Sequence, residues 1–435
     1  MSALKVSFLR LAFVLAAVAG AAPAFGAPAT PAAASLDGAN TAWMLVSTVL
    51  VLLMTMPGIM LFYSGMLRTR NTLSIMAQTI AGIGVITVMW AAVGYSLAFT
   101  PGNAWIGDLR RVMAEGLIGG ASIAIHPIAP TIPESVFFLY QMAFAIITFA
   151  IILGATAERL RIGASMVFGA IWLVLVYAPV AHWVWHPNGW LAAMGHMDFA
   201  GGTVVHIQAG AAGLAAAIAV GPRQGFGKQP MVPHNLALTV LGAGLLWAGW
   251  FGFNAGSSYE ASARAAGALL ATQLAAGAGA LCWGVAEMFR RQQMSVLGMA
   301  TGAIAGLIAV TPASGYVGVG GALAIGAIAG VVCFAVVTTF KHFTHIDDSL
   351  DVFALHGVGG VVGTVLTPVF ALKAIAPITA DVATNALGAA AVMAYTGLMT
   401  WGILKGLDFI AGLRVNPRDE HVGLDLSQHG ESLAS

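Results

Sequence analysis

Two histidines inside apolar segments are the side chains of this 435-residue chain best suited to chemistry. His206 ends the stretch DFAGGTVVH (198–206) and His356 ends the stretch DVFALH (351–356); each stretch begins with an aspartate. Ionisable side chains are costly inside a membrane, so those that occur there mark functional sites. If the two rings meet, one ring can donate its N–H to the other, and each keeps an outer nitrogen for a ligand. Burial favours the uncharged imidazole, so the sequence indicates a neutral pair able to accept a hydrogen bond or a proton.

Other arrangements of these side chains stay open. Each histidine can instead be satisfied on its own by a backbone carbonyl. A zinc site would need a third ligand at metal-ligand spacing. The sequence offers none, because Cys282 and Cys333 lie in apolar runs and are expected to be inert packing residues. No cofactor is therefore expected. Asp198 begins its predicted helix and is expected to cap free backbone N–H groups. In that position it would also place negative potential just beneath a cation site at the outer end of the helix.

The composition identifies the class of protein that must position these residues. Hydrophobic residues make up 59% of the chain and charged residues 8%, whereas a soluble domain carries about 25% charge. The chain is therefore expected to be a polytopic membrane protein. Its formal net charge of +1 argues against a nucleic-acid partner.

The first residues read as a targeting signal. Lys5 and Arg10 precede a short apolar run, and the small residues AAPAFG follow it. This pattern predicts a signal peptide of residues 1–26, cleaved after Gly26. The expected location is a bacterial inner membrane, with the mature N-terminus in the periplasm.

Eleven apolar stretches approach the ~20 residues that a helix needs to cross a bilayer. They are residues 41–67, 72–99, 135–157, 163–183, 199–221, 235–257, 265–289, 295–312, 317–340, 352–371 and 385–409. An odd number places the C-terminal tail, residues 410–435, in the cytoplasm. Loop charges agree, because twelve arginines and lysines fall on the predicted cytoplasmic side and four on the other.

The two histidines fall five spans apart, in the fifth and tenth stretches. Their helices therefore enter the membrane from opposite faces, as in an inverted repeat with a site on its pseudo-two-fold axis. The predicted fold is an all-α polytopic membrane domain, residues 27–409. It contains a five-plus-five inverted repeat of eleven transmembrane helices in total: repeats at about 41–221 and 235–371 and an additional C-terminal helix at 385–409.

Three further stretches combine aromatic rings with small polar groups. They are YQMAF (140–144), YAPVAHWVW (177–185) and WAGWFGFNAGS (247–257). The faces of Trp and Phe rings attract a cation by about 0.5–2 kcal/mol, and a serine hydroxyl can accept a hydrogen bond from it. Together these groups favour a small cation that donates hydrogen bonds, with no carboxylate to trap it.

With these motifs, the sequence resembles the ammonium transporters of the Amt/Mep/Rh class, and the bacterial Amt branch most. The match runs over essentially the whole mature chain. The segments that carry it are PGIMLFYSG (57–65), GATAERLR (154–161), DFAGGTVVHI (198–207), GFGK (225–228), GWFGFNAGS (249–257), TPASGYVGVGGA (311–322) and DVFALHGVGG (351–360).

The resemblance implies a role for each candidate site residue. The residues that recruit ammonium at the outer mouth would be Phe144, Trp185 and Ser257. Phe144 and Phe253 would stack as a gate over the pore.

Below the gate, His206 and His356 would be the twin pore histidines, and Trp250 would line the pore beside them. Asp198 would be the carboxylate near the recruiting site. Tyr140 departs from the phenylalanine of close relatives, and its hydroxyl is expected to alter the rim.

The resemblance also implies a mechanism and partners. NH4+ would be recruited and deprotonated, and NH3 would pass the histidines with or without the proton; methylammonium would serve as an analogue. A homotrimer among membrane lipids is expected, with one pore per subunit. The tail GLRVNPRDEHVGLDLSQHGE (412–431) would be ordered and would imply inhibition by a PII signal protein.

Three rival functions are less well supported. A membrane enzyme using the histidines as acid and base would need a nucleophile or metal nearby, and none is evident. A sensor would be expected to carry an appended signalling domain, and only a short tail follows residue 409. A proton-coupled carrier for another solute would place carboxylates or arginines in mid-span. The expected function is therefore transport, not enzymatic catalysis.

Overall fold

The structure is a computed structural model that describes residues 35–119 and 123–433. The predicted signal peptide, residues 1–26, lies outside the described residues. Helices account for the fold of the described part, where β-pairing is limited to two isolated bridges, Leu160 with Arg414 and Val317 with Ala371.

The membrane-spanning segments follow the predicted order. In the labels, α marks α-helices and η marks short helical segments of another type: η2 is a 3-10 helix, and η1, η3, η5, η6 and η7 are π-helical. The first five spans are α2–η1–α3 (Gly38–Leu53, Met54–Ile59, Met60–Met66), η2–α4–η3–α5 (Thr69–Asn71, Thr72–Met89, Trp90–Gly94, Tyr95–Phe99), α6 (Glu134–Thr156), α7–η5–α8–α9 (Ile162–Trp172, Leu173–Tyr177, Ala178–Trp185, Trp190–Ala193) and η6–α10 (Gly202–Ile207, Gln208–Val220). The other six are α11 (Leu236–Gly256), α12 (Ala263–Arg291), α13 (Val296–Val310), α14 (Val319–Thr344), η7–α15 (Phe353–Gly357, Val358–Phe370) and α16 (Val382–Ala411).

Ten of these segments are long and apolar enough to cross a membrane. The eighth, α13, has 15 residues, so it spans only ~22 Å at 1.5 Å per residue. The all-α fold predicted from the sequence is thus confirmed, with one span shorter than expected.

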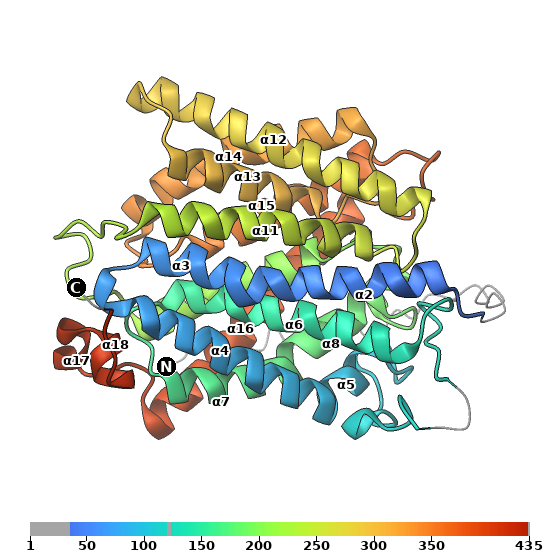
Figure 1. Cartoon of the computed structure of the whole chain (residues 1–435), viewed down its shortest axis with the longest axis horizontal. Helices are drawn as coiled ribbons and strands as arrows, with labels where there is room; N and C mark the ends of the chain where they lie inside the picture. Colours follow the sequence, from blue (N-terminus) through green and yellow to red (C-terminus); the bar gives the residue numbers. More distant parts are fainter. Residues whose placement is uncertain (1–34, 120–122, 434–435) are drawn as a thin grey trace, which may run out of the picture. The chain divides into compact units, whose positions relative to one another are not determined.

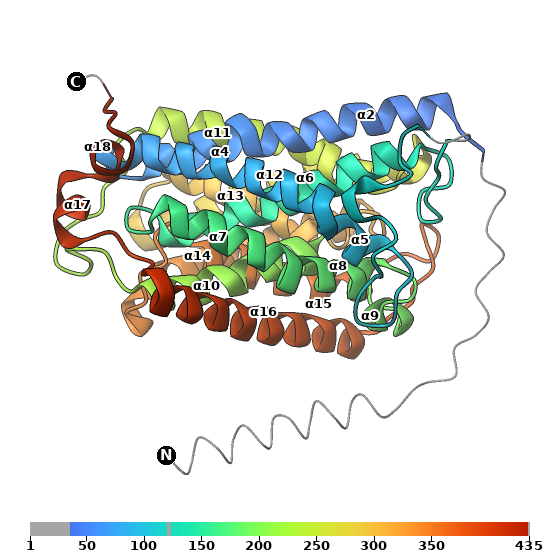
Figure 2. The same cartoon turned by 90° about the horizontal axis from the view of Figure 1, so that it is seen from below.

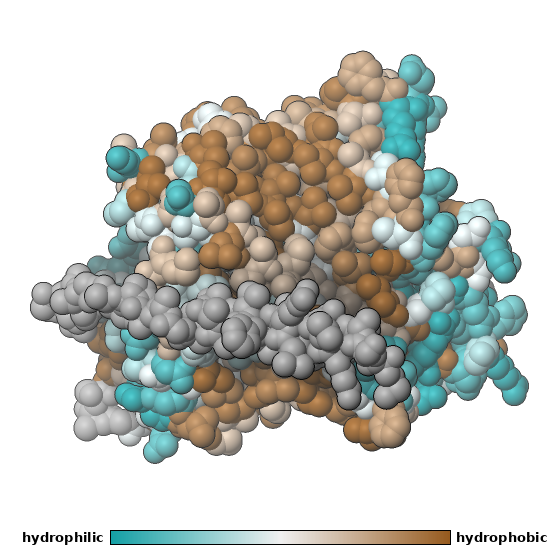
Figure 3. Space-filling model, turned by 180° about the vertical axis from the view of Figure 1, so that it is seen from behind, coloured by the Kyte–Doolittle hydropathy of each residue, from teal (hydrophilic) through white to brown (hydrophobic). Residues whose placement is uncertain are grey.

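The helices run side by side, as Figures 1 and 2 show from two directions. The short helices α17 (Pro417–Val422) and α18 (Leu424–His429) lie at one end of the bundle, here named the tail end. The loop after α5 lies at the opposite end, here named the loop end. On the face seen in Figure 3, apolar side chains cover the middle and hydrophilic ones gather toward the two ends. This belt suits a multi-pass membrane protein.

The fifth and tenth spans have the same construction. Each begins with a π-helical segment that contains the histidine, η6 with His206 and η7 with His356. Each continues as a 13-residue α-helix, α10 or α15. π-helical turns are rare and recur at functional sites. The repeated pattern is what an inverted repeat requires.

An aspartate caps the start of each of these two spans, and in the tenth span it is Asp348 rather than the aspartate of the stretch DVFALH. Asp198 accepts bonds from the backbone N–H of residues 201, 202, 203 and 204. Its counterpart is Asp348, whose Oδ2 accepts the N–H of Phe353 at 2.7 Å. Asp351 instead pairs with Lys341 at 3.0 Å. Asp351, which begins the stretch DVFALH, therefore has a different role from Asp198.

Glycines bring the two histidine-bearing spans into backbone contact. A Cβ atom built at Gly210 would collide with the backbone N and Cα atoms of Gly357. Without those glycines the two spans would stand further apart. This crossing lies next to His206 and His356, so it sets the distance between their rings.

Buried charges join loops at the tail end. The Arg223 guanidinium contacts Asp347 at 2.8 Å and Glu158 at 3.2 Å, and Glu158 also pairs with Arg68 at 2.7 Å. Burial disfavours the Glu158 carboxylate, but Arg223 and Arg68 outweigh it and hold the pKa of Glu158 below its ordinary value. The network fixes the end of α6 to its neighbours.

The tail folds back onto the second span. The Oδ1 atom of Asp425 in α18 accepts the N–H of Ser74 at 2.7 Å, and the N–H of Leu424 donates to Asn71 at 2.9 Å. Asn71 precedes α4 but makes no side-chain cap on it. Asp425 therefore takes the place of the N-cap residue of α4.

Candidate functional site

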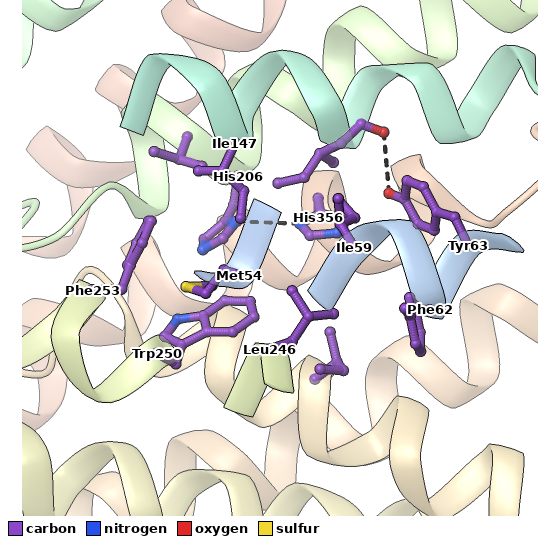
Figure 4. A pocket seen from close by; sticks show the side chains of 13 residues that line it. Met54, Ile59, Phe62, Tyr63, Ile147, His206, Leu246, Trp250, Phe253 and His356 are labelled. Atoms are coloured by element: carbon purple, nitrogen blue, oxygen red, sulfur yellow. Dashed lines mark hydrogen bonds between the residues drawn. The ribbon is translucent and has the colours of Figure 1, made fainter. Parts of the chain in front are cut away.

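The two predicted histidines meet inside the bundle. Their Nδ1 atoms lie 3.2 Å apart, as the dashed line in Figure 4 marks. Both side chains are buried, with 1% of His206 and 7% of His356 exposed. A contact between two ring nitrogens needs one N–H, so one ring donates and the other accepts. Within the described residues, the Nε2 atom of His206 has no hydrogen-bond partner.

Both histidines line a small, largely apolar cavity. Its volume is about 20 Å³, which is room for one molecule the size of water. Most of its walls are aliphatic and aromatic, and Figure 4 shows them on both sides of the histidines. The polar atoms of two wall residues are already used: Tyr63 donates to the Ile151 carbonyl and Trp250 to the Thr311 hydroxyl. The imidazole nitrogens are thus the polar groups available to a small guest.

A pair of stacked phenylalanines lies beside the histidines. The rings of Phe144 and Phe253 are 4.1 Å apart and inclined by 17°. The ring of His206 lies 6.0 Å from Phe253 and 5.5 Å from Trp250. In Figure 4, Phe253 and His356 lie on opposite sides of His206. A molecule approaching the histidines from the Phe253 side meets the stacked rings first.

The predicted recruiting residues gather around the same stacked rings. The Trp185 ring lies 5.8 Å from Phe144, edge to face, and its Nε1 donates to the Asp198 carbonyl. Ser257 donates its hydroxyl proton to the Phe253 carbonyl at 2.9 Å. All the candidate residues named from the sequence therefore fall in one continuous site.

Two helix ends shape the electrostatics of this site. α11 ends at Gly256, so its carbonyl end carries partial negative charge beside Ser257. The N-terminal end of η6 carries partial positive charge, and the Asp198 carboxylate accepts the free backbone N–H groups there. Burial raises the pKa of Asp198, while its four backbone N–H donors act against that rise. The environment at the loop end therefore suits a cation without a free carboxylate.

The sequence reasoning missed two contributions to the site. The first span lines the cavity with Met54 and Ile59, which belong to the π-helical segment η1 around Pro57. The proline inside an apolar run was the available signal. Asp348 was also missed, although it precedes His356 by the same eight positions that separate Asp198 from His206.

The chain is similar to known proteins over most of its length. The model of the Ammonium Transporter Family matches residues 42–433. The chain is 42% identical to an ammonium transporter of Mycobacterium bovis over 431 residues, covering 91% of this chain and 90% of the relative. It is 41% identical to the ammonium transporter of Bacillus subtilis over 403 residues, covering 90% and 97%.

Solved structures share the fold. Mep2 of Saccharomyces cerevisiae superposes with a TM-score of 0.81 at 35% identity, covering 88% of this chain and 89% of that one. A sensor Amt protein gives 0.83 at 29% identity, covering 90% and 98%. With a family match over nearly the whole described chain and this fold, the protein belongs to the Ammonium Transporter Family.

Proposed function

We propose that this ammonium transporter recruits NH4+ at the site formed by Phe144, Trp185 and Ser257, deprotonates it there, and conducts NH3 past His206 and His356. The observation that carries the proposal is the 3.2 Å contact between the two histidine rings inside an otherwise apolar cavity. This contact requires neither ring to be charged. The proton passes to water at the outer mouth and either stays there or crosses by a separate route.

Recruitment is supported by the groups that surround the mouth. Phe144 and Trp185 offer ring faces and edges, and Ser257 offers oxygen lone pairs because its proton is bonded to the Phe253 carbonyl. Cation–π attraction contributes about 0.5–2 kcal/mol here. This is enough to concentrate a cation without holding it permanently.

Selectivity follows from what the guest can do in the cavity. A charged ion that enters an apolar passage loses several kcal/mol of hydration, whereas neutral NH3 loses far less. Ammonium can give up a proton and donate hydrogen bonds to imidazole nitrogens. Potassium, which is of similar size, can do neither, so the same passage excludes it.

The surroundings of the pore belong to the same proposal. The loop end would face the periplasm and the tail end the cytoplasm of a bacterial inner membrane, as the distribution of loop charges supports. The subunits would form a homotrimer among membrane lipids. The folded tail would form part of a surface for a PII signal protein. A pull-down with PII, with and without ADP, ATP and 2-oxoglutarate, tests that partner.

Uptake of radiolabelled methylammonium into proteoliposomes tests the function itself. We expect saturable uptake that unlabelled ammonium inhibits and potassium does not. Empty liposomes control for diffusion of the uncharged amine. Uptake no faster than in empty liposomes would contradict the proposal.

A further inference from the structure

We propose that Tyr140 is a positioning residue of the ammonium-recruiting site, which fixes the Ser257 hydroxyl and the Phe253 backbone against the helix that bears Phe144. The inference rests on the proposed function of that site. It concerns a hydroxyl group that the recruitment mechanism above does not use.

The Tyr140 hydroxyl lies between two helices. Tyr140 belongs to α6, and its Oη atom is 2.8 Å from the Phe253 carbonyl oxygen, 3.0 Å from that of Gly252 and 3.2 Å from the Ser257 Oγ atom. The carbonyls of Gly252 and Phe253 lie near the C-terminal end of α11, and Ser257 is the C-cap residue of that helix. The side chain of Tyr140 is fully buried, so water does not compete for these bonds.

The protons in this cluster leave Ser257 as an acceptor. Tyr140 and Ser257 have one hydroxyl proton each. The shortest contacts direct both protons to the carbonyls, the Ser257 proton to Phe253 at 2.9 Å and the Tyr140 proton to Phe253 or Gly252. If Ser257 donates to Tyr140 instead, its proton is still held inside the cluster. In either case the Ser257 oxygen presents only lone pairs to a cation.

The ring of Tyr140 fixes the same parts mechanically. It lies 4.9 Å from the Phe144 ring and 6.0 Å from the Tyr259 ring. Tyr140 therefore packs on one member of the stacked pair, Phe144, and bonds to the backbone of the other, Phe253. The two rings of that pair come from different helices, and Tyr140 joins those helices within one turn of the stack.

The chain leaves room for this hydroxyl. A Cβ atom at Gly256 would lie 2.8 Å from Tyr140 Oη and 2.7 Å from Ser47 Cβ, closer than packed atoms approach. Glycine at this position thus permits the hydroxyl to reach the end of α11 while α2 packs on the other side. This is an independent sign that the hydroxyl is part of the site.

The test removes the hydroxyl alone. We expect Tyr140→Phe to raise the half-saturation concentration for methylammonium uptake about three- to tenfold, the effect of losing one or two buried hydrogen bonds. The maximal rate should change less. Tyr395→Phe is the matched control, because its hydroxyl also donates to a backbone carbonyl, that of Leu175, but outside the site. The control should leave the half-saturation concentration unchanged.

A double-mutant cycle distinguishes positioning from general stability. Because Tyr140 acts through Ser257, adding Tyr140→Phe to Ser257→Ala should change the half-saturation concentration less than twofold. An equal rise in both backgrounds, or a lowered Tm with no rise at all, overturns the inference. If Tyr140→Phe does not fold, Gly256→Ala in a Ser47→Gly background, which removes the competing contact with Ser47, displaces the hydroxyl instead. It must give a similar rise over Ser47→Gly alone; no rise would overturn the inference.

The same assay separates this inference from the proposed function. Wild-type uptake that Ser257→Ala weakens and Tyr140→Phe does not would overturn the positioning role alone. Wild-type protein without saturable uptake would overturn the proposed function.

Discussion

The Nδ1 atoms of His206 and His356 lie 3.2 Å apart although the two residues are 150 positions apart in the chain. Each histidine is held by a π-helical segment at the start of its own span. Their contact therefore depends on how the two halves of the molecule pack. A change in the packing of either half should alter the distance between the two rings.

Acidic replacement of the histidines should abolish the discrimination between ammonium and potassium. A carboxylate at position 206 or 356 would stabilise a bare cation in the cavity, where the neutral imidazole does not. We expect His206→Asp, His356→Asp and the double variant to conduct potassium, measured as currents across a planar or solid-supported membrane. Unaltered exclusion of potassium by a folded, ammonium-conducting variant would contradict the selectivity mechanism.

Gly210→Ala should slow transport although this residue does not line the cavity. The added methyl group would meet the backbone of Gly357 and push the fifth and tenth spans apart. We expect uptake to fall at least tenfold and the Tm to fall as well. Gly397→Ala is the control, because nothing lies within 4 Å of its built Cβ. Equal uptake by both variants would show that the crossing does not set the pore geometry.

The sequence predicts much of this fold because its signals are local. Apolar length marks the helices, and the two histidines stand out as rare ionisable groups in apolar segments. The π-helical turns at His206 and His356 are not predictable in this way, since they depend on packing between spans. The bond from Tyr140 to the Gly252 carbonyl, 112 positions away, leaves no local pattern either. Asp348 was predictable, because it precedes His356 by the eight positions that separate Asp198 from His206.

Asp198→Ala should destabilise the protein more than Asp348→Ala. Removal of the Asp198 carboxylate leaves up to four buried N–H groups without an acceptor, and each such group costs about 1–3 kcal/mol. Asp348 accepts the Phe353 N–H through Oδ2, while its Oδ1 has no hydrogen-bond partner within the described residues. We expect the larger fall in Tm for Asp198→Ala, measured in detergent. Asp198→Asn, which keeps one oxygen, should fall in between. The reverse order would contradict the capping role.

Trp185→Leu should weaken recruitment and leave the pore below it intact. Loss of a cation–π contact of about 0.5–2 kcal/mol raises the half-saturation concentration about 2- to 30-fold. Trp183→Leu is the matched control, because the Trp183 ring packs on Tyr395 and its Nε1 donates to the Trp105 carbonyl. Ammonium-evoked currents at graded concentrations measure both. A rise that is as large in the control would show that the effect is structural.

Acid should destabilise the buried charge network at the tail end. Burial disfavours the carboxylates of Glu158 and Asp347, but their arginine partners, Arg223 foremost, outweigh it and lower the pKa of both. Groups whose pKa is lower in the folded state add stability above the ordinary carboxyl pKa of about 4. That stability is lost as the pH falls through the folded values. We therefore expect the Tm to fall below about pH 4.

Asp347→Asn separates this network from other acid effects. At pH 7 it should lower the stability by about 3–5 kcal/mol, because it leaves part of the buried Arg223 charge unpaired. Its Tm should also fall less steeply in acid than that of the wild type. The exposed Glu115→Gln should follow the wild-type curve. An acid profile unchanged by Asp347→Asn would show that the loss arises elsewhere.

The bond from Asp425 to Ser74 has a consequence for biosynthesis. Ser74 in the second span leaves the ribosome 351 positions before Asp425, the residue that completes the beginning of its helix. The start of α4 therefore stays without this cap until Asp425 has been synthesised. Chains that stop before Asp425 keep that uncapped helix start.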